Sequence, residues 1–80
     1  MNNEYNLIDV SEESTSVEMF AIPSSKSLVI KWKGRKDLYL YTLTNESGVG
    51  HWIRLVVEFG YGKATNIIKK ECAEPIKVLA

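Results

Sequence analysis

Residues 27–43, SLVIKWKGRKDLYLYTL, decide how this chain folds. Aromatic and β-branched residues are dense in this stretch, and they favour a sheet. Ser27–Trp32 is predicted as one strand and Asp37–Leu43 as the next, because apolar and polar side chains alternate along the first of them. The turn between them is KGRK, residues 33–36, whose Gly34 is free to adopt a positive φ. We therefore predict a β-hairpin with a cationic tip.

A further strand is predicted before the hairpin, over Ser16–Ile22, and residues 23–26, PSSK, form the turn that joins the two. Alternation places Leu28, Ile30 and Trp32 on one face of the sheet. We expect one core with contributions from both hairpin strands and from the segments that follow. Its expected members are Leu28, Ile30, Leu40, Val56, Ile67 and Ile68.

The segment 51–59, HWIRLVVEF, is open to two interpretations. A helix would place Trp52, Val56 and Phe59 on one side, which is the usual pattern of a helix that covers a core. A strand would suit the β-branched Ile53 and Val57 equally well. The helix is the favoured interpretation.

After a break at residues 60–62, GYG, the pattern of Lys63–Cys72 predicts a second short helix. Pro75 ends it, and residues 76–79, IKVL, are predicted as a terminal strand. With 80 residues, 45% apolar and 25% charged, the chain has the size and composition of one small globular domain. We assign residues 15–80 to a small α+β domain, an antiparallel β-meander with one or two short helices packed on one face. A domain of this size has a modest core, so a homodimer is an open possibility.

Residues 1–14 form an acidic leader, for which a flexible segment and an added edge strand both remain open. Residues 1–22 carry five acidic and no basic side chains, whereas the remainder carries ten basic and five acidic ones. The net charges are therefore −5 and +5. Such segregation marks either a binding surface or a leader that pairs with the basic face of its own domain.

We predict a cytoplasmic protein with no membrane segment. Cys72 is the single cysteine, which excludes an intrachain disulfide and fits a reducing compartment. No apolar run approaches the roughly 20 residues that span a bilayer. The first ten residues, MNNEYNLIDV, are acidic and polar, unlike a secretory signal.

Catalysis is not expected. His51 is the single histidine, and Cys72 is expected on the buried side of a helix, where a cysteine acts as a small apolar residue. A zinc site needs three or four ligands, and paired carboxylates for acid–base chemistry are missing. The GYGK sequence at 60–63 lacks the spacing of a phosphate-binding loop. We predict no enzyme activity, no cofactor and no metal.

The cationic hairpin is the best candidate for a site. Basic side chains that crowd around aromatic ones are typical of surfaces that hold a nucleic-acid backbone and stack its bases. The alternative is that lysines on exposed strands only prevent aggregation between sheet edges. The predicted nucleic-acid-binding residues are Lys31, Trp32, Lys33, Arg35, Lys36, Tyr39, Tyr41 and Lys63.

The order of segments resembles the KTSC domain, a short module found alone in bacteria and phages and fused to the C-terminus of some lysyl-tRNA synthetases. The pieces that carry the resemblance span roughly Phe20 to Lys70: SLVIKW, KGRK, LYLYTL, HWIRLVVEF, GYGK and ATNIIKK. A Val-Pro pair that usually follows the Tyr-x-Tyr strand is replaced here by Leu43-Thr44. The resemblance implies an α+β module with no established catalysis and a suspected association with nucleic acid.

Together these features predict a small non-catalytic binding module that associates with nucleic acid through a basic, aromatic hairpin. The alternative is a protein-interaction or inhibitor module of bacterial or phage origin. Net neutrality favours the alternative, because nucleic-acid binders are usually basic overall, while the local charge of the hairpin favours nucleic acid.

Overall fold

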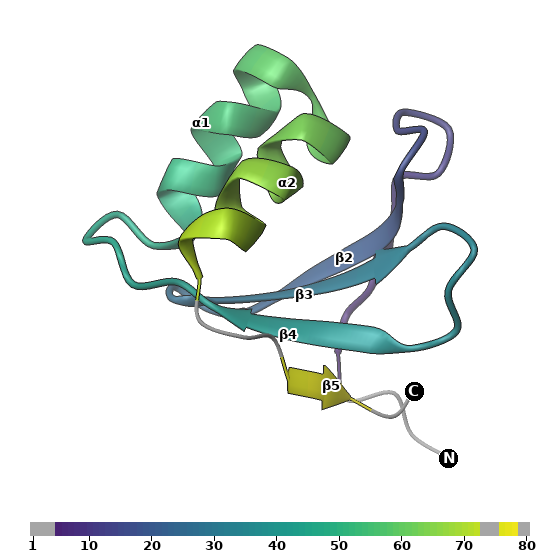
Figure 1. Ribbon diagram of the computed structural model, residues 1–80, viewed down its shortest axis with the longest axis horizontal. Helices are drawn as coiled ribbons and strands as arrows, with labels where there is room; N and C mark the ends of the chain where they lie inside the picture. Colours follow the sequence, from purple (N-terminus) through teal and green to yellow (C-terminus); the bar gives the residue numbers. More distant parts are fainter. Residues whose placement is uncertain (1–4, 73–75, 79–80) are drawn as a thin grey trace.

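In the part of the chain that the structure describes, five antiparallel strands follow one another across a single sheet in the order of the chain (Figure 1). The computed structural model of the protein describes residues 5–72 and 76–78. The strands are β1 (Ile8–Asp9), β2 (Val17–Ser24), β3 (Ser27–Trp32), β4 (Leu38–Thr42) and β5 (Ile76–Val78). The predicted meander is confirmed in β2, β3 and β4, and short strands extend it at both edges.

Two helices, α1 (Val49–Phe59) and α2 (Tyr61–Glu71), lie together on one face of the sheet (Figure 1). The favoured helical interpretation of residues 51–59 is therefore confirmed. Helix α1 begins two residues earlier, where the Val49 N–H donates to the Ser25 carbonyl in the β2–β3 turn at 2.8 Å. Gly60 alone separates the helices, and its φ of 92° lets the chain turn sharply enough for both to pack on the same face.

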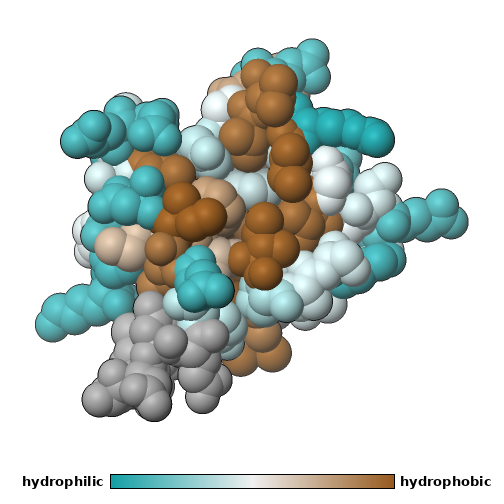
Figure 2. Space-filling view, turned by 180° about the vertical axis from the view of Figure 1, so that it is seen from behind, coloured by the Kyte–Doolittle hydropathy of each residue, from teal (hydrophilic) through white to brown (hydrophobic). Residues whose placement is uncertain are grey.

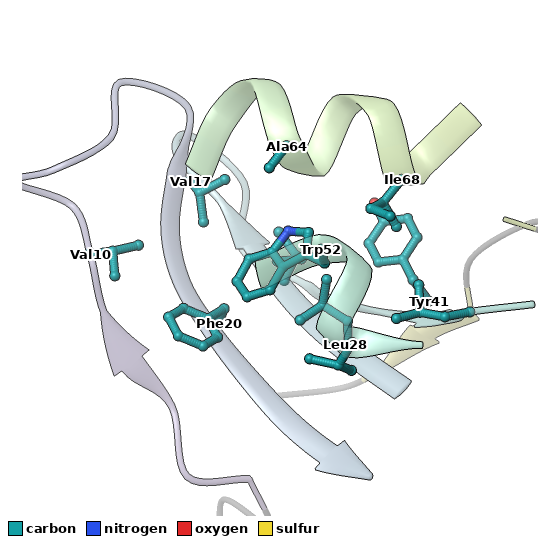
Figure 3. Packing of buried hydrophobic residues seen from close by; sticks show 11 residues of the cluster. Val10, Val17, Phe20, Leu28, Tyr41, Trp52, Ala64 and Ile68 are labelled. Atoms are coloured by element: carbon teal, nitrogen blue, oxygen red, sulfur yellow. The ribbon is translucent and has the colours of Figure 1, made fainter. Parts of the chain in front are cut away.

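The main core lies between the helices and the sheet, with Trp52 near its centre (Figure 3). The Trp52 ring lies 5.1 Å from Phe20 and 5.9 Å from Tyr61, measured between centroids, in the tilted arrangements that aromatic pairs prefer. Its Nε1–H donates to Thr65 Oγ1 at 3.0 Å, so the one polar atom of this buried ring is satisfied by α2. Trp52 thus joins both helices to β2.

The expected core is correct for Leu28, Ile30 and Ile68, which are all at most 1% exposed, but it is wrong for Leu40. Leu28 pairs with Tyr41 across β3 and β4, so Tyr41 shares its face and Leu40 lies on the opposite one. A five-residue connection, Lys33–Asp37, sets this register, and a shift of one residue moves every side chain to the other face. Of the two remaining expected members, Val56 is half-buried against the core, and Ile67 is half-buried but is not part of it.

The face of the sheet away from the helices carries a second, smaller cluster. Ala21, Val29 and Leu38 are buried there, with Leu40 half-buried beside them. Tyr5 and Leu7, which precede β1, pack against this cluster. Val10 follows β1 and is 2% exposed in the main core. The described part of the acidic leader therefore contributes to both faces of the sheet.

Within residues 5–72 and 76–78, neither helix has the length and apolar character that crossing a bilayer requires.

Candidate nucleic-acid interface

The β3–β4 hairpin positions the first residues of the candidate site. Strand β3 ends at Trp32, and the chain turns through Gly34, which has a φ of 82°. The Arg35 N–H donates to the Trp32 carbonyl at 3.1 Å and closes this turn. The turn therefore holds the Arg35 backbone close to Trp32, as a tight connection between two strands requires.

A cleft of about 580 Å³ opens between this hairpin and helix α2. The segment that leads into β2 forms its third wall. The lining residues are Thr15 and Ser16 from that segment, Trp32, Lys33, Arg35, Tyr39 and Tyr41 from the hairpin, and Asn66 and Lys69 from α2. Five of the eight sequence-predicted site residues thus lie around one cavity.

The aromatic side chains of the cleft differ in how much of each is exposed to solvent. Tyr41 is 2% exposed and its ring belongs to the core, so it forms the floor rather than a stacking surface. Its hydroxyl accepts a hydrogen bond from Trp32 Nε1 at 3.1 Å, which fixes the orientation of the indole. Trp32 and Tyr39 are half-buried and keep part of each ring at the surface. These two rings are the ones that could stack on a flat ligand.

Positive charge surrounds the cleft, and no carboxylate is among its described lining residues. The Lys69 ammonium lies 5.3 Å from the centroid of the Trp32 ring, a cation–π contact that holds it beside the indole. Arg35 is exposed and forms no ion pair within residues 5–72 and 76–78. An anionic group would therefore enter a site with fixed cations and no opposing acid on its walls.

Lys33 has a structural contact as well as a place in the cleft. Its ammonium donates to the Ser11 carbonyl at 2.6 Å and also to the Ser14 carbonyl. Ser14 Oγ in turn accepts hydrogen bonds from the N–H groups of Ser16 and Val17. Lys33 thus fixes the segment that forms the third wall, and one of its three N–H donors is left for a ligand.

Burial raises the pKa of the Tyr41 hydroxyl, and the hydrogen bond from Trp32 opposes this shift only in part. The group therefore stays protonated at neutral pH. It accepts from Trp32 and retains its own O–H, which can donate to an acceptor in the cleft.

The other three predicted site residues do not line the cleft. Lys31 points to the opposite face of the sheet, where its ammonium pairs with Glu18 at 2.8 Å. Lys36 is exposed in the hairpin connection. Lys63 lies over the Phe59 ring, 5.1 Å from its centroid, at a smaller neighbouring hollow.

Sequence reasoning missed the contribution of α2. Asn66 and Lys69 are three residues apart, so they share one side of the helix and both reach the cleft. Both side chains are exposed. Nothing local, however, shows that this side of α2 lies across from Trp32, because that depends on how the helices pack on the sheet.

His51 and Cys72 were considered as a catalytic pair. His51 Nε2 lies 3.5 Å from Glu71 Oε1, and no hydrogen bond or ion pair among the described residues joins it to Cys72. Burial raises the pKa of the Cys72 thiol, with a smaller contribution from Glu71, which makes the reactive thiolate scarcer at neutral pH. In the part of the chain that the structure describes, no three His, Cys, Asp or Glu side chains gather as a metal site would require.

A scan against models of known protein families finds no match, and neither do searches of curated proteins and of solved structures. The resemblance to the KTSC domain therefore stays a prediction.

Proposed function

We propose that this protein is a non-catalytic module that binds single-stranded nucleic acid in the cleft between the hairpin and α2. One observation carries the proposal: Trp32 and Tyr39 lie in the same cleft as Lys33, Arg35 and Lys69, without a carboxylate on its described walls. Flat rings suit bases, and cations suit phosphates. The implied association of KTSC-like modules with nucleic acid agrees with it, as does the cytoplasmic location expected from the sequence.

A single strand fits this cleft better than a duplex. Stacking on Trp32 or Tyr39 requires a base with a free face, and bases in a duplex already stack on one another. Three cations line the cleft, so the logarithm of the binding constant should fall with the logarithm of salt concentration with a slope of about −2. The small slope follows from the positions of Lys31 and Lys63 outside the cleft.

The test compares Lys69→Glu with Lys70→Glu. Both residues are exposed neighbours in the last turn of α2, but only Lys69 lines the cleft. Binding of a fluorescently labelled oligothymidylate and of oligouridylate is followed by anisotropy at low salt. We expect Lys69→Glu to lose binding and Lys70→Glu to stay close to wild type, because long-range charge is the same in both variants.

Trp32→Leu provides a second readout that does not depend on charge. Loss of one base–aromatic stack costs about 1–3 kcal/mol, so the dissociation constant should rise about 5- to 150-fold with the salt slope unchanged. His51→Ala and Cys72→Ser should leave binding intact. Equal affinities for the Lys69 and Lys70 variants, or no binding of either oligonucleotide by the wild type at low salt, would reject the proposed function.

A protein-interaction module is the second candidate, and a different surface favours it. Ile53 and Val57 of α1 are 46% and 83% exposed, which is unusual for large apolar side chains on a helix that packs against a core. The two candidates are compatible, since no residue of α1 lines the cleft.

A further inference from the structure

Helix α1 carries an apolar ridge that the rest of the described chain leaves uncovered. Ile53 and Val57 are four residues apart and so lie one above the other, on a side turned away from the buried Trp52. Viewed from behind, the molecule shows apolar side chains gathered on this face (Figure 2). Hydrophobic burial would favour covering such a ridge.

Exposed apolar side chains also lie at the neighbouring edge of the sheet. Phe20 of β2 contacts Trp52 of α1, so the helix passes over this strand. Ile8 of β1 pairs with Phe20, which places its side chain on the helix-covered face, where it is 52% exposed. Ile22, two residues after Phe20, is 43% exposed. Ile8 and Ile22 line a hollow together with Tyr5 and Ala21, so the ridge on α1 consists of Ile53 and Val57.

Two charges beside the ridge indicate what covers it. Arg54 follows Ile53 in the sequence and Glu58 follows Val57, so these two charged residues are also four residues apart. Neither forms an ion pair with another described residue. When two copies of α1 pack antiparallel with the two-fold axis between residues 55 and 56, positions 53 and 57 of opposite copies lie within one residue rise, about 1.5 Å, of facing each other, and so do positions 54 and 58. Ile53 then meets Val57, and Arg54 meets Glu58, on both sides of the axis.

We propose that the protein forms a homodimer through antiparallel packing of α1 against α1 of a second copy. Arg54 and Glu58 have the same four-residue spacing as Ile53 and Val57, so the surface is complementary to a second copy of itself. Binding of an unrelated partner would not require this matched spacing. Dimerisation does not depend on the proposed nucleic-acid binding, because the cleft is formed by other elements and stays open.

Sedimentation equilibrium of the full chain tests the proposal, with Val57→Asp as the disrupting variant. Each substitution occurs twice across a two-fold interface, so the dimer dissociation constant should rise at least about a hundredfold, tenfold for each copy. Ile76→Asp is the matched control, because Ile76 is equally apolar, 60% exposed and located in β5 at the other sheet edge. Circular dichroism checks that both variants are folded. A monomeric wild type at the highest concentration reached, or a dimer lost in the Ile76 variant and kept in the Val57 variant, overturns the proposal.

Charge reversal tests the antiparallel register. Arg54→Glu alone gives four acidic groups at the interface, and Glu58→Arg alone gives four basic ones, so each variant should be mainly monomeric. An equimolar mixture of the two should form a heterodimer, because each 54–58 contact then joins opposite charges. The double variant Arg54→Glu/Glu58→Arg should recover the homodimer. A mixture that stays as monomeric as its components overturns this register.

Discussion

Gly48 and Gly50 lie two residues apart at the start of α1, but only the position of Gly50 has room for a side chain. Gly48 has a φ of 57°, and a Cβ placed there would lie 2.2 Å from the Ser25 carbonyl oxygen, a backbone atom. Gly50 is inside the helix, and a Cβ there would meet nothing within 4 Å. The first glycine is needed for the contact between α1 and the β2–β3 turn, and the second is not.

We therefore expect Gly48→Ala to lower the free energy of unfolding by at least about 1–3 kcal/mol, the usual cost of such backbone strain. Gly50→Ala should raise it by about 0.5–1 kcal/mol, because alanine restricts the unfolded chain and suits a helix interior. Urea denaturation followed by circular dichroism measures both. A Gly48→Ala variant as stable as the wild type would show that α1 does not dock on this turn.

Alkaline pH should destabilise the protein in two steps. Burial raises the pKa of the Cys72 thiol above its ordinary 9.0 and that of the Tyr41 hydroxyl above its ordinary 10.0. The unfolded chain loses these protons first, so the free energy of unfolding is full below about pH 9 and falls as pH rises through the folded-state pKa values. Urea midpoints between about pH 8 and about pH 11 measure the effect.

Cys72→Ser should remove the earlier part of this decline and Tyr41→Phe the later part. Tyr41→Phe also loses the acceptor for Trp32, at a pH-independent cost of about 0.5–1.5 kcal/mol. If both single variants reproduced the wild-type profile above pH 9, the decline would belong to other groups.

At the scale of the elements, the register between β3 and β4 decides which of Leu28 and Leu40 contributes more to the free energy of unfolding. Leu28 is fully buried between sheet and helices, whereas Leu40, on the other face, is only half-buried. Leu28→Ala should cost about 2–5 kcal/mol, and Leu40→Ala clearly less. Equilibrium urea denaturation of the two variants measures the difference. Equal losses would mean that the second cluster, beneath Tyr5 and Leu7, is as important as the main core.

The elements could be predicted from sequence because their signals are local. Alternation in SLVIKW, turn residues in KGRK and helical spacing in HWIRLVVEF each depend on neighbours within a few positions. The face of the sheet on which Leu40 lies could not be predicted, because one residue more or less in the β3–β4 connection would move every side chain of β4 to the opposite face. The candidate cleft divides in the same way: its hairpin half follows from sequence order, while Asn66 and Lys69 arrive only through packing of α2.

For the whole molecule, the acidic leader is structural as well as electrostatic. Deleting residues 1–14 is therefore a poor way to remove its charge, because Val10 is in the core and Lys33 is bonded to Ser11 and Ser14. We expect that deletion to unfold or strongly destabilise the domain, with a loss of the cooperative thermal transition. Single substitutions that neutralise one acidic side chain separate the two roles.

Glu13 is the acid to change, because it is exposed and lines the hollow that shares Thr15, Ser16 and Asn66 with the cleft. Glu46→Gln, in the loop before α1, removes the same charge from an exposed site outside both cavities. If nucleic acid is the ligand, Glu13→Gln should strengthen oligothymidylate binding at low salt more than Glu46→Gln does. The difference should shrink at 1 M salt, where the screening length falls to about 3 Å. Anisotropy titrations at the two salt concentrations measure it. Identical affinities for the two variants at low salt would show that the leader does not compete with phosphate for the cations of the cleft.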